Sequence, residues 1–230
     1  MYAKDLRYQA RQALAGRWGI AILVTLLASI LGASVAATNV SFDINVDAEV
    51  LQKLPEKFRV TATMILGGMA TVGGTLGLVQ FILGGVIKLG YCRFLLKNHD
   101  GEEGEVSDLF SRFDRFGDGF VLQLLTGLYT ALWTLLFIIP GIVASYKYAM
   151  APFIMEENPD MKASEAITAS KEMMDGHKAD LFVLDLSFLG WALLNIFTLG
   201  IGSLWLNPYI NAAYAAFYRT LQPKAVEVGE

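Results

Sequence analysis

The stretch "GWALLNIFTLGIGSLWLNPYINAAYAAFY", residues 190–218, decides the topology of the chain because it holds no charged residue. It belongs to a charge-free run over residues 186–218. As one helix this run would be about 50 Å long, against a membrane hydrocarbon core of roughly 30 Å. Gly200 and Gly202 lie in its middle, and glycine permits the backbone reversal of a tight connection. The stretch therefore predicts two helices that fold back on each other as a hairpin.

The rest of the chain has the composition of a membrane protein. Three further charge-free runs cover residues 19–38, 60–87 and 119–146, and a membrane-spanning helix needs roughly 20 apolar residues. Of the 230 residues, 54% are hydrophobic and 17% are charged, whereas soluble domains carry about 25% charged residues. These features predict a multi-pass membrane protein and argue against a soluble domain with buried core helices. The first run has the length of a span rather than of a signal peptide, so we expect it to stay in the chain.

Pro140 and Gly141 interrupt the third run, and proline often begins a new helix because it removes a backbone donor. Splitting the third and fourth runs gives six predicted spans in one integral membrane domain. They lie at about 19–38, 62–88, 119–139, 141–157, 181–198 and 201–221. The predicted fold is an all-α polytopic membrane bundle of three transmembrane hairpins, with an extracellular loop at 39–61 and a polar tail at 222–230.

The distribution of basic residues supports this topology. With both termini cytoplasmic, every Lys and Arg except Lys53, Lys57 and Arg59 lies on the inner side, as the positive-inside rule requires. A four-span alternative would place the lysines that follow Tyr146 outside. The distribution therefore favours six spans.

A polar segment with helical periodicity and a glycine precedes each predicted hairpin. The three segments are "RQALAGRWGIAILV", "FDRFGDGFVLQLL" and "EMMDGHKADLFVL", and aligning Gly16, Gly117 and Gly176 gives the same order of polar turns, glycine and span. The pattern predicts a cytoplasmic amphipathic helix in the membrane interface before each hairpin. An ordinary polar loop is the alternative.

Polar residues in the last two spans are the candidates for binding a ligand. Asp185 is the one clear ionisable residue within a span, where a charge is costly and often functional. One face of the last helix, beside Pro208, carries four further polar residues, Asn207, Asn211, Tyr214 and Tyr218. Asn195 and Gln123 can join them from other spans. The alternatives are an Asp185 that reaches water or pairs with Lys178, and polar residues that only hydrogen-bond helices together. The candidate ligand-binding residues are Asp185, Asn195, Asn207, Asn211, Tyr214 and Tyr218.

Other chemistry has little support in the sequence. The glycine-dense second span, with Gly73 and Gly77 four residues apart, predicts close helix packing rather than a phosphate-binding loop. HExxH, GxSxG and cysteine–histidine patterns do not occur, so we expect no enzyme and no catalytic residue. A single cysteine, Cys92, and two distant histidines predict no metal site and no cofactor. The net charge of -4 argues against a nucleic-acid partner.

Several long stretches resemble a known family. They are "ARQALAGRWGIAI", "IIPGIVASYKYAMAPFIMEENPDMKASEAITASKEMMDGHKADLFVLDLSFLGW" and "TLGIGSLWLNPYINAAYAAFY". These are similar to a bacterial family of integral membrane proteins catalogued as domain of unknown function 975. The resemblance implies a multi-pass protein of the bacterial cell membrane and assigns no substrate or site residue.

Two functions remain as hypotheses. The first is a non-enzymatic binder or carrier of a lipid or another amphiphilic small molecule, drawn from the lipid bilayer. The second is a membrane scaffold, assembly or protective factor that acts through a membrane protein partner.

Overall fold

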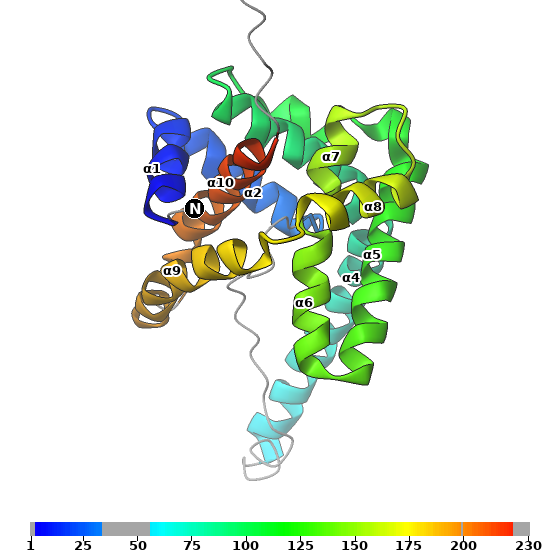
Figure 1. Cartoon of the computed structure of the whole chain (residues 1–230). Coiled ribbons are helices and arrows are strands. Elements are labelled where there is room, and N and C mark those ends of the chain that lie inside the picture. The colour runs from blue at the N-terminus through cyan, green and yellow to red at the C-terminus, as the bar shows by residue number, and fades with distance from the viewer. Residues whose placement is uncertain (1–2, 34–55, 199, 223–230) are drawn as a thin grey trace, which may run out of the picture.

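The computed structural model describes residues 3–33, 56–198 and 200–222, and every regular element within them is a helix (Figure 1). The α-helices are α1 (Ala3–Leu14), α2 (Trp18–Ile30), α4 (Glu56–His99), α5 (Phe116–Leu136), α6 (Ile138–Tyr148), α7 (Ala151–Glu157), α8 (Ala163–Met173), α9 (Lys178–Phe197) and α10 (Ser203–Leu221). Two short 3-10 helices, η1 (Val106–Phe110) and η2 (Phe113–Arg115), lie between α4 and α5. The predicted all-α class is confirmed.

The number of spans differs from the prediction. Among the described residues, two segments are long and apolar enough to cross a membrane, Val79–His99 and Val106–Leu136. A third arises if α1 and α2, which are bent by 102° at their junction, count as one broken span. Six spans are therefore not found. The main reason is length, because α2, α6 and α7 have 13, 11 and 7 residues, fewer than the roughly 20 that a bilayer requires.

Helix α4 is the largest departure from the predicted boundaries. It has 44 residues, about 66 Å at 1.5 Å per residue, and it continues beyond both predicted ends of the 62–88 span. Its last turns stay helical because Tyr91, Cys92 and Phe94 are buried in the protein core. At its start, α4 includes residues 56–61 of the predicted extracellular loop. The rest of that loop lies outside the described residues, as does the tail predicted at 222–230 except for residue 222.

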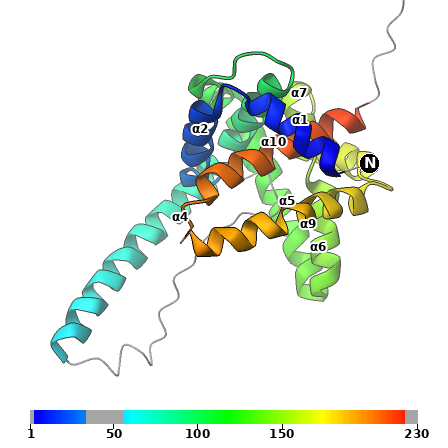
Figure 2. The same ribbon diagram turned by 90° about the vertical axis from the view of Figure 1, so that its left-hand side faces the viewer.

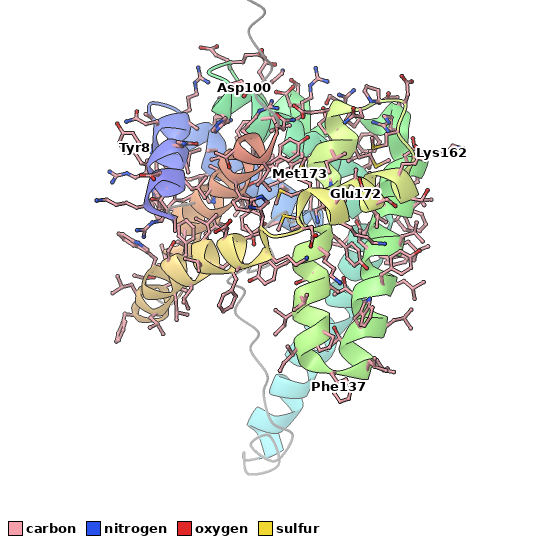
Figure 3. The ribbon with its side chains drawn as sticks, viewed as in Figure 1. Tyr8, Asp100, Phe137, Lys162, Glu172 and Met173 are labelled. Atoms are coloured by element: carbon pink, nitrogen blue, oxygen red, sulfur yellow. The ribbon has the colours of Figure 1, made fainter. Side chains whose placement is uncertain are left out.

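Both predicted breaks in the apolar runs are confirmed. Gly200 has a φ of 86° between α9 and α10, so the stretch at 190–218 contains two helices. Phe137 has extended backbone angles between α5 and α6, three residues before Pro140, which then sits in the first turn of α6. Helices α5 and α6 run side by side, with Phe137 at the tip of their hairpin (Figures 1 and 3). Helix α9 lies crosswise to this hairpin in both ribbon views (Figures 1 and 2).

The predicted amphipathic segments form helices in two of three places. Helices α1 and α8 precede α2 and α9, and each pair is separated by a glycine in the left-handed region, Gly16 (φ 77°) and Gly176 (φ 78°). Gly117 instead lies in the first turn of α5. The segment before it forms η1 and η2, because its arginines turn inward and hold it against α7. Arg112 donates to both carboxylate oxygens of Glu156, at 2.7 and 2.6 Å.

Helix α10 forms the centre of the core. Residues 210–218 are all buried, and α10 contacts α1, α2, α4 and α9. The ring of Tyr218 stacks on that of Phe153 in α7, with centroids 5.2 Å apart. The polar and small residues of α10 thus contact other helices rather than the surroundings. The outer faces of α5, α6 and α9 behave differently, since each exposes large apolar side chains such as Leu132, Ile142 and Leu186.

Candidate functional site

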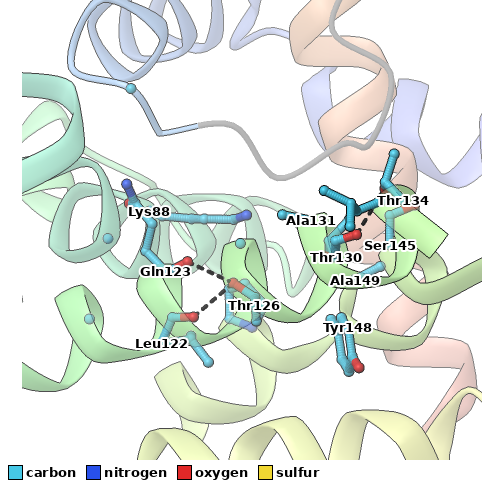
Figure 4. A pocket seen from close by; sticks show the side chains of 16 residues that line it. Lys88, Leu122, Gln123, Thr126, Thr130, Ala131, Thr134, Ser145, Tyr148 and Ala149 are labelled. Carbon is cyan, nitrogen blue, oxygen red and sulfur yellow. Dashed lines mark hydrogen bonds between the residues drawn. The ribbon is translucent and has the colours of Figure 1, made fainter. Parts of the chain in front are cut away.

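A cavity with a volume of about 850 Å³ lies between α4, α5 and α6 (Figure 4). This volume falls in the range of about 300–1,000 Å³ that is usual for small-molecule sites. We call it the Lys88 cavity. It is lined by Gly32, Gly85, Lys88, Gly119, Leu122, Gln123, Thr126, Gly127, Thr130, Ala131, Thr134, Leu135, Ser145, Tyr148, Ala149 and Pro152.

Two glycines set the distance between the walls of this cavity. A Cβ atom built on Gly85 of α4 would lie 2.1 Å from the carbonyl oxygen of Gly119 in α5. One built on Gly119 would lie 2.9 Å from the carbonyl carbon of Gly85. The two backbones therefore touch here, and only residues without a side chain permit the contact. The predicted packing role of the glycine-dense run is found at this position and not at Gly77, where nothing lies within 4 Å.

Lys88 follows Gly85 by about one helical turn, and its side chain extends into the cavity (Figure 4). It is the only charged side chain among the described residues that line the cavity. Within the described part of the chain, its ammonium group makes no hydrogen bond or ion pair. The side chain is partly buried, and it belongs to the span-length segment Val79–His99. A cation at such a place normally pairs with an anion or reaches a water-filled space.

Hydroxyl groups line the cavity beyond Lys88. Thr126, Thr130 and Thr134 are spaced by four residues along one face of α5, and Ser145 and Tyr148 line the α6 side. The hydroxyl groups of Thr126 and Thr134 donate to the carbonyl oxygens of Leu122 and Thr130, at 2.7 and 2.8 Å. Their donors are thus used within α5, which leaves uncharged oxygen acceptors facing the cavity. The cavity therefore combines one cation with an uncharged wall of hydroxyl and apolar groups.

Two tyrosines, Tyr146 of α6 and Tyr214 of α10, contact the carboxylate of Asp185 in α9. The hydroxyl of Tyr146 donates to Asp185 Oδ2 at 2.8 Å. The hydroxyl of Tyr214 lies 3.0 Å from both carboxylate oxygens. Asp185 does not pair with Lys178, which donates to Asp175 at 3.0 Å. The sequence singled out Asp185 and Tyr214 but missed Tyr146, because no local pattern connects residues 39 positions apart.

The other predicted site residues are spread over the protein. Tyr218 donates to Glu157 at 2.6 Å, and Asn211 donates to the carbonyl oxygen of Asn207, one turn earlier, at 2.8 Å. Asn207 Oδ1 is buried and has no hydrogen-bond partner among the described residues. Asn195 borders a second, smaller cavity. None of the six lines the Lys88 cavity, so their role in ligand binding stays a prediction.

Lys88 is not among the predicted site residues, because it lies at the inner end of the span predicted at 62–88. The stretch "GGVIKLGYC", residues 84–92, does contain a signal for Lys88, since apolar residues surround the lysine on both sides. A lysine within an apolar segment usually faces the interior of a helix bundle or a water-filled cavity. Gln123, the further residue considered with the six, does line the cavity, and its amide donates to the carbonyl oxygen of Phe81 at 3.4 Å.

A protein-family model described as protein of unknown function, DUF975, matches residues 1–145 of the chain and also residues 134–225. The two matches together span most of the sequence, so the chain belongs to this family, and the resemblance seen in the sequence is confirmed. No curated protein and no solved structure shows significant similarity to the chain.

Proposed function

We propose that this member of the DUF975 family is a multi-pass protein of the bacterial cell membrane that binds or carries an anionic amphiphile in the Lys88 cavity, without catalysing a reaction. Both termini are cytoplasmic in this proposal. The observation that carries it is the ammonium group of Lys88, which has no anionic partner among the described residues and lines a cavity of ligand size.

The charge of Lys88 selects the kind of headgroup. A lysine placed at the centre of a membrane helix costs about 2.5–3.5 kcal/mol on insertion scales, and a bound anion offsets part of that cost. No carboxylate of the described lining does so. A carboxylate or phosphate group of a ligand supplies the missing charge. The headgroup therefore lies at the Lys88 end of the cavity.

The remainder of the lining suits a ligand whose tail is a hydrocarbon chain that carries few polar groups. Leu122, Ala131 and Leu135 contribute apolar surface along α5. Two hydroxyl groups beside them, those of Thr126 and Thr134, already donate within the helix. The exposed apolar faces of α5, α6 and α9 support contact with lipid outside the cavity. A molecule with a small anionic head and an apolar tail, such as a fatty acid or a lipid phosphate, fits both parts.

The test is native mass spectrometry of the protein released from its own membrane in a mild detergent, comparing Lys88→Met with wild type. Methionine keeps most of the side-chain length and removes the charge. A hydrogen bond to a charged group contributes about 1.5–3 kcal/mol, and 1.4 kcal/mol is a factor of ten. We therefore expect wild type to retain an anionic amphiphile and Lys88→Met to retain at least about tenfold less.

The matched control is Lys162→Met, which removes the same charge from an exposed side chain on the outside of the molecule (Figure 3). It should retain the amphiphile as wild type does. Equal retention by Lys88→Met and wild type would overturn the proposal. Wild type that carries only loosely bound bulk lipid, or a stoichiometric second protein instead, would favour the scaffold hypothesis.

A further inference from the structure

A second cavity, of about 480 Å³, lies where α1 and α2 meet the α9–α10 hairpin. Three of the four tryptophans of the chain line it, namely Trp18, Trp191 and Trp205. Arg11 and Tyr209 also contribute to its wall. We call it the tryptophan cavity. It shares no lining residue with the Lys88 cavity.

The three indole groups are available to a ligand. The Trp18 ring packs near that of Tyr209, with centroids 6.4 Å apart. Trp191 and Trp205 are 54% and 52% exposed. In the described part of the protein, no hydrogen bond uses the N–H group of any of these indoles. Tryptophan favours the headgroup level of a membrane, where its ring contacts hydrocarbon and its N–H group reaches a polar acceptor.

Arg11 supplies the only charge among the described residues of this lining. Arg7, one turn earlier on α1, is occupied, because it donates to the carbonyl oxygen of Ser187 at 3.2 Å. Arg11 has no hydrogen bond or ion pair among the described residues. A guanidinium group binds phosphate oxygens well because its N–H groups form a planar fork. The cavity is therefore complementary to an anion with an apolar body.

We propose that the tryptophan cavity binds one anionic glycerophospholipid from the surrounding bilayer. Its phosphate group pairs with Arg11, and its ester carbonyl groups accept hydrogen bonds from the indoles. Its acyl chains continue over the exposed apolar end of α9, where Leu194 and Phe197 are exposed. This site is separate from the Lys88 cavity, and it does not depend on the function proposed for that cavity.

The tryptophans make a direct test possible. Trp133→Phe removes the only tryptophan outside the cavity, so that the remaining fluorescence comes from the three lining indoles. This variant is reconstituted into phosphatidylcholine vesicles that contain either brominated phosphatidylglycerol or brominated phosphatidylcholine at matched fractions. Bromine quenches nearby tryptophans. Measurements at about 1 M salt, where the screening length is about 3 Å, suppress the general attraction between anionic lipid and exposed basic residues.

We expect the brominated anionic lipid to quench at lower mole fraction than the zwitterionic one. Arg11→Gln, added to Trp133→Phe, should weaken this preference about fivefold, the effect of one basic contact with an anionic lipid. Lys4→Gln, which removes the same charge from an exposed site on the same helix, should leave the preference unchanged. Lys88→Met should also leave it unchanged, which separates this site from the Lys88 cavity. Equal quenching by the two lipids, or an equal loss of preference in Arg11→Gln and Lys4→Gln, would overturn the proposal.

Discussion

Replacing Gly85 by alanine tests the contact that shapes the Lys88 cavity. The new Cβ atom would lie 2.1 Å from the carbonyl oxygen of Gly119, whereas ordinary contacts begin at about 3.4 Å. The obstacle is backbone of α5, which cannot rotate away as a side chain would. Helices α4 and α5 must therefore separate by about 1 Å at their crossing. Gly77→Ala is the matched control, because it lies on the same helix with nothing within 4 Å.

The difference in stability between Gly85→Ala and Gly77→Ala gives the cost of the steric clash with α5. Alanine in place of glycine favours a helix by about 0.5–1 kcal/mol, and this gain applies to both variants. Overpacking costs about 1–3 kcal/mol, and a gap of 0.5–1 Å loses a quarter to a half of the dispersion energy of the contacts it opens. We therefore expect Gly85→Ala to have a free energy of unfolding about 1–3 kcal/mol lower than that of Gly77→Ala.

The single cysteine provides the assay. Cys92 is fully buried in α4, so a maleimide reagent can label it only when the protein opens. When opening is faster than labelling, the labelling rate follows the population of the open form. At one temperature in detergent, Gly85→Ala should label about 5- to 150-fold faster than Gly77→Ala, since each 1.4 kcal/mol is a factor of ten. Labelling at the same rate would refute the backbone contact between α4 and α5.

The same labelling assay tests two further features. Tyr146→Phe removes one hydroxyl donor from the Asp185 carboxylate at 2.8 Å and should lower the free energy of unfolding by about 1.5–3 kcal/mol, as for a hydrogen bond to a charged group. No change would contradict the hydrogen bond. Gly16→Ala and Gly176→Ala place a side chain at φ values of 77° and 78° with open space around it, so each should cost about 1–2 kcal/mol through the backbone alone. Gly117→Ala, which lies in a helix with equally open space, should instead raise the free energy of unfolding by about 0.5–1 kcal/mol. A loss similar to that of the other two variants would show that all three glycines have the same conformation.

Much of the helical organisation follows from local sequence. Charge-free runs located the apolar helices, and the breaks at Pro140 and Gly200 were predictable because proline and glycine change what the backbone itself can do. Gly16 and Gly176 were likewise recognisable as helix-ending residues. Gly117 shows the limit of that reasoning. The same residue type stays helical there because Arg112 is drawn to Glu156, which lies 44 positions further along the chain.

The ends of the helices and the number of spans depended on tertiary contacts. Hydropathy measures how apolar a segment is, but it does not distinguish a helix surrounded by lipid from one surrounded by protein. The last turns of α4 are buried by neighbouring helices, so α4 continues past Lys88, where a span had been predicted to end.

The site itself arose almost entirely from the way the helices cross. The sequence alone identified Asp185 and Tyr214 as unusual, because polar groups are costly in apolar helices wherever they end up. It could not join Tyr146 to them, or reveal that Lys88 faces a cavity. A cavity is the space left between helices, and its walls are set by the contact of Gly85 with Gly119, two residues that only the folded chain brings together.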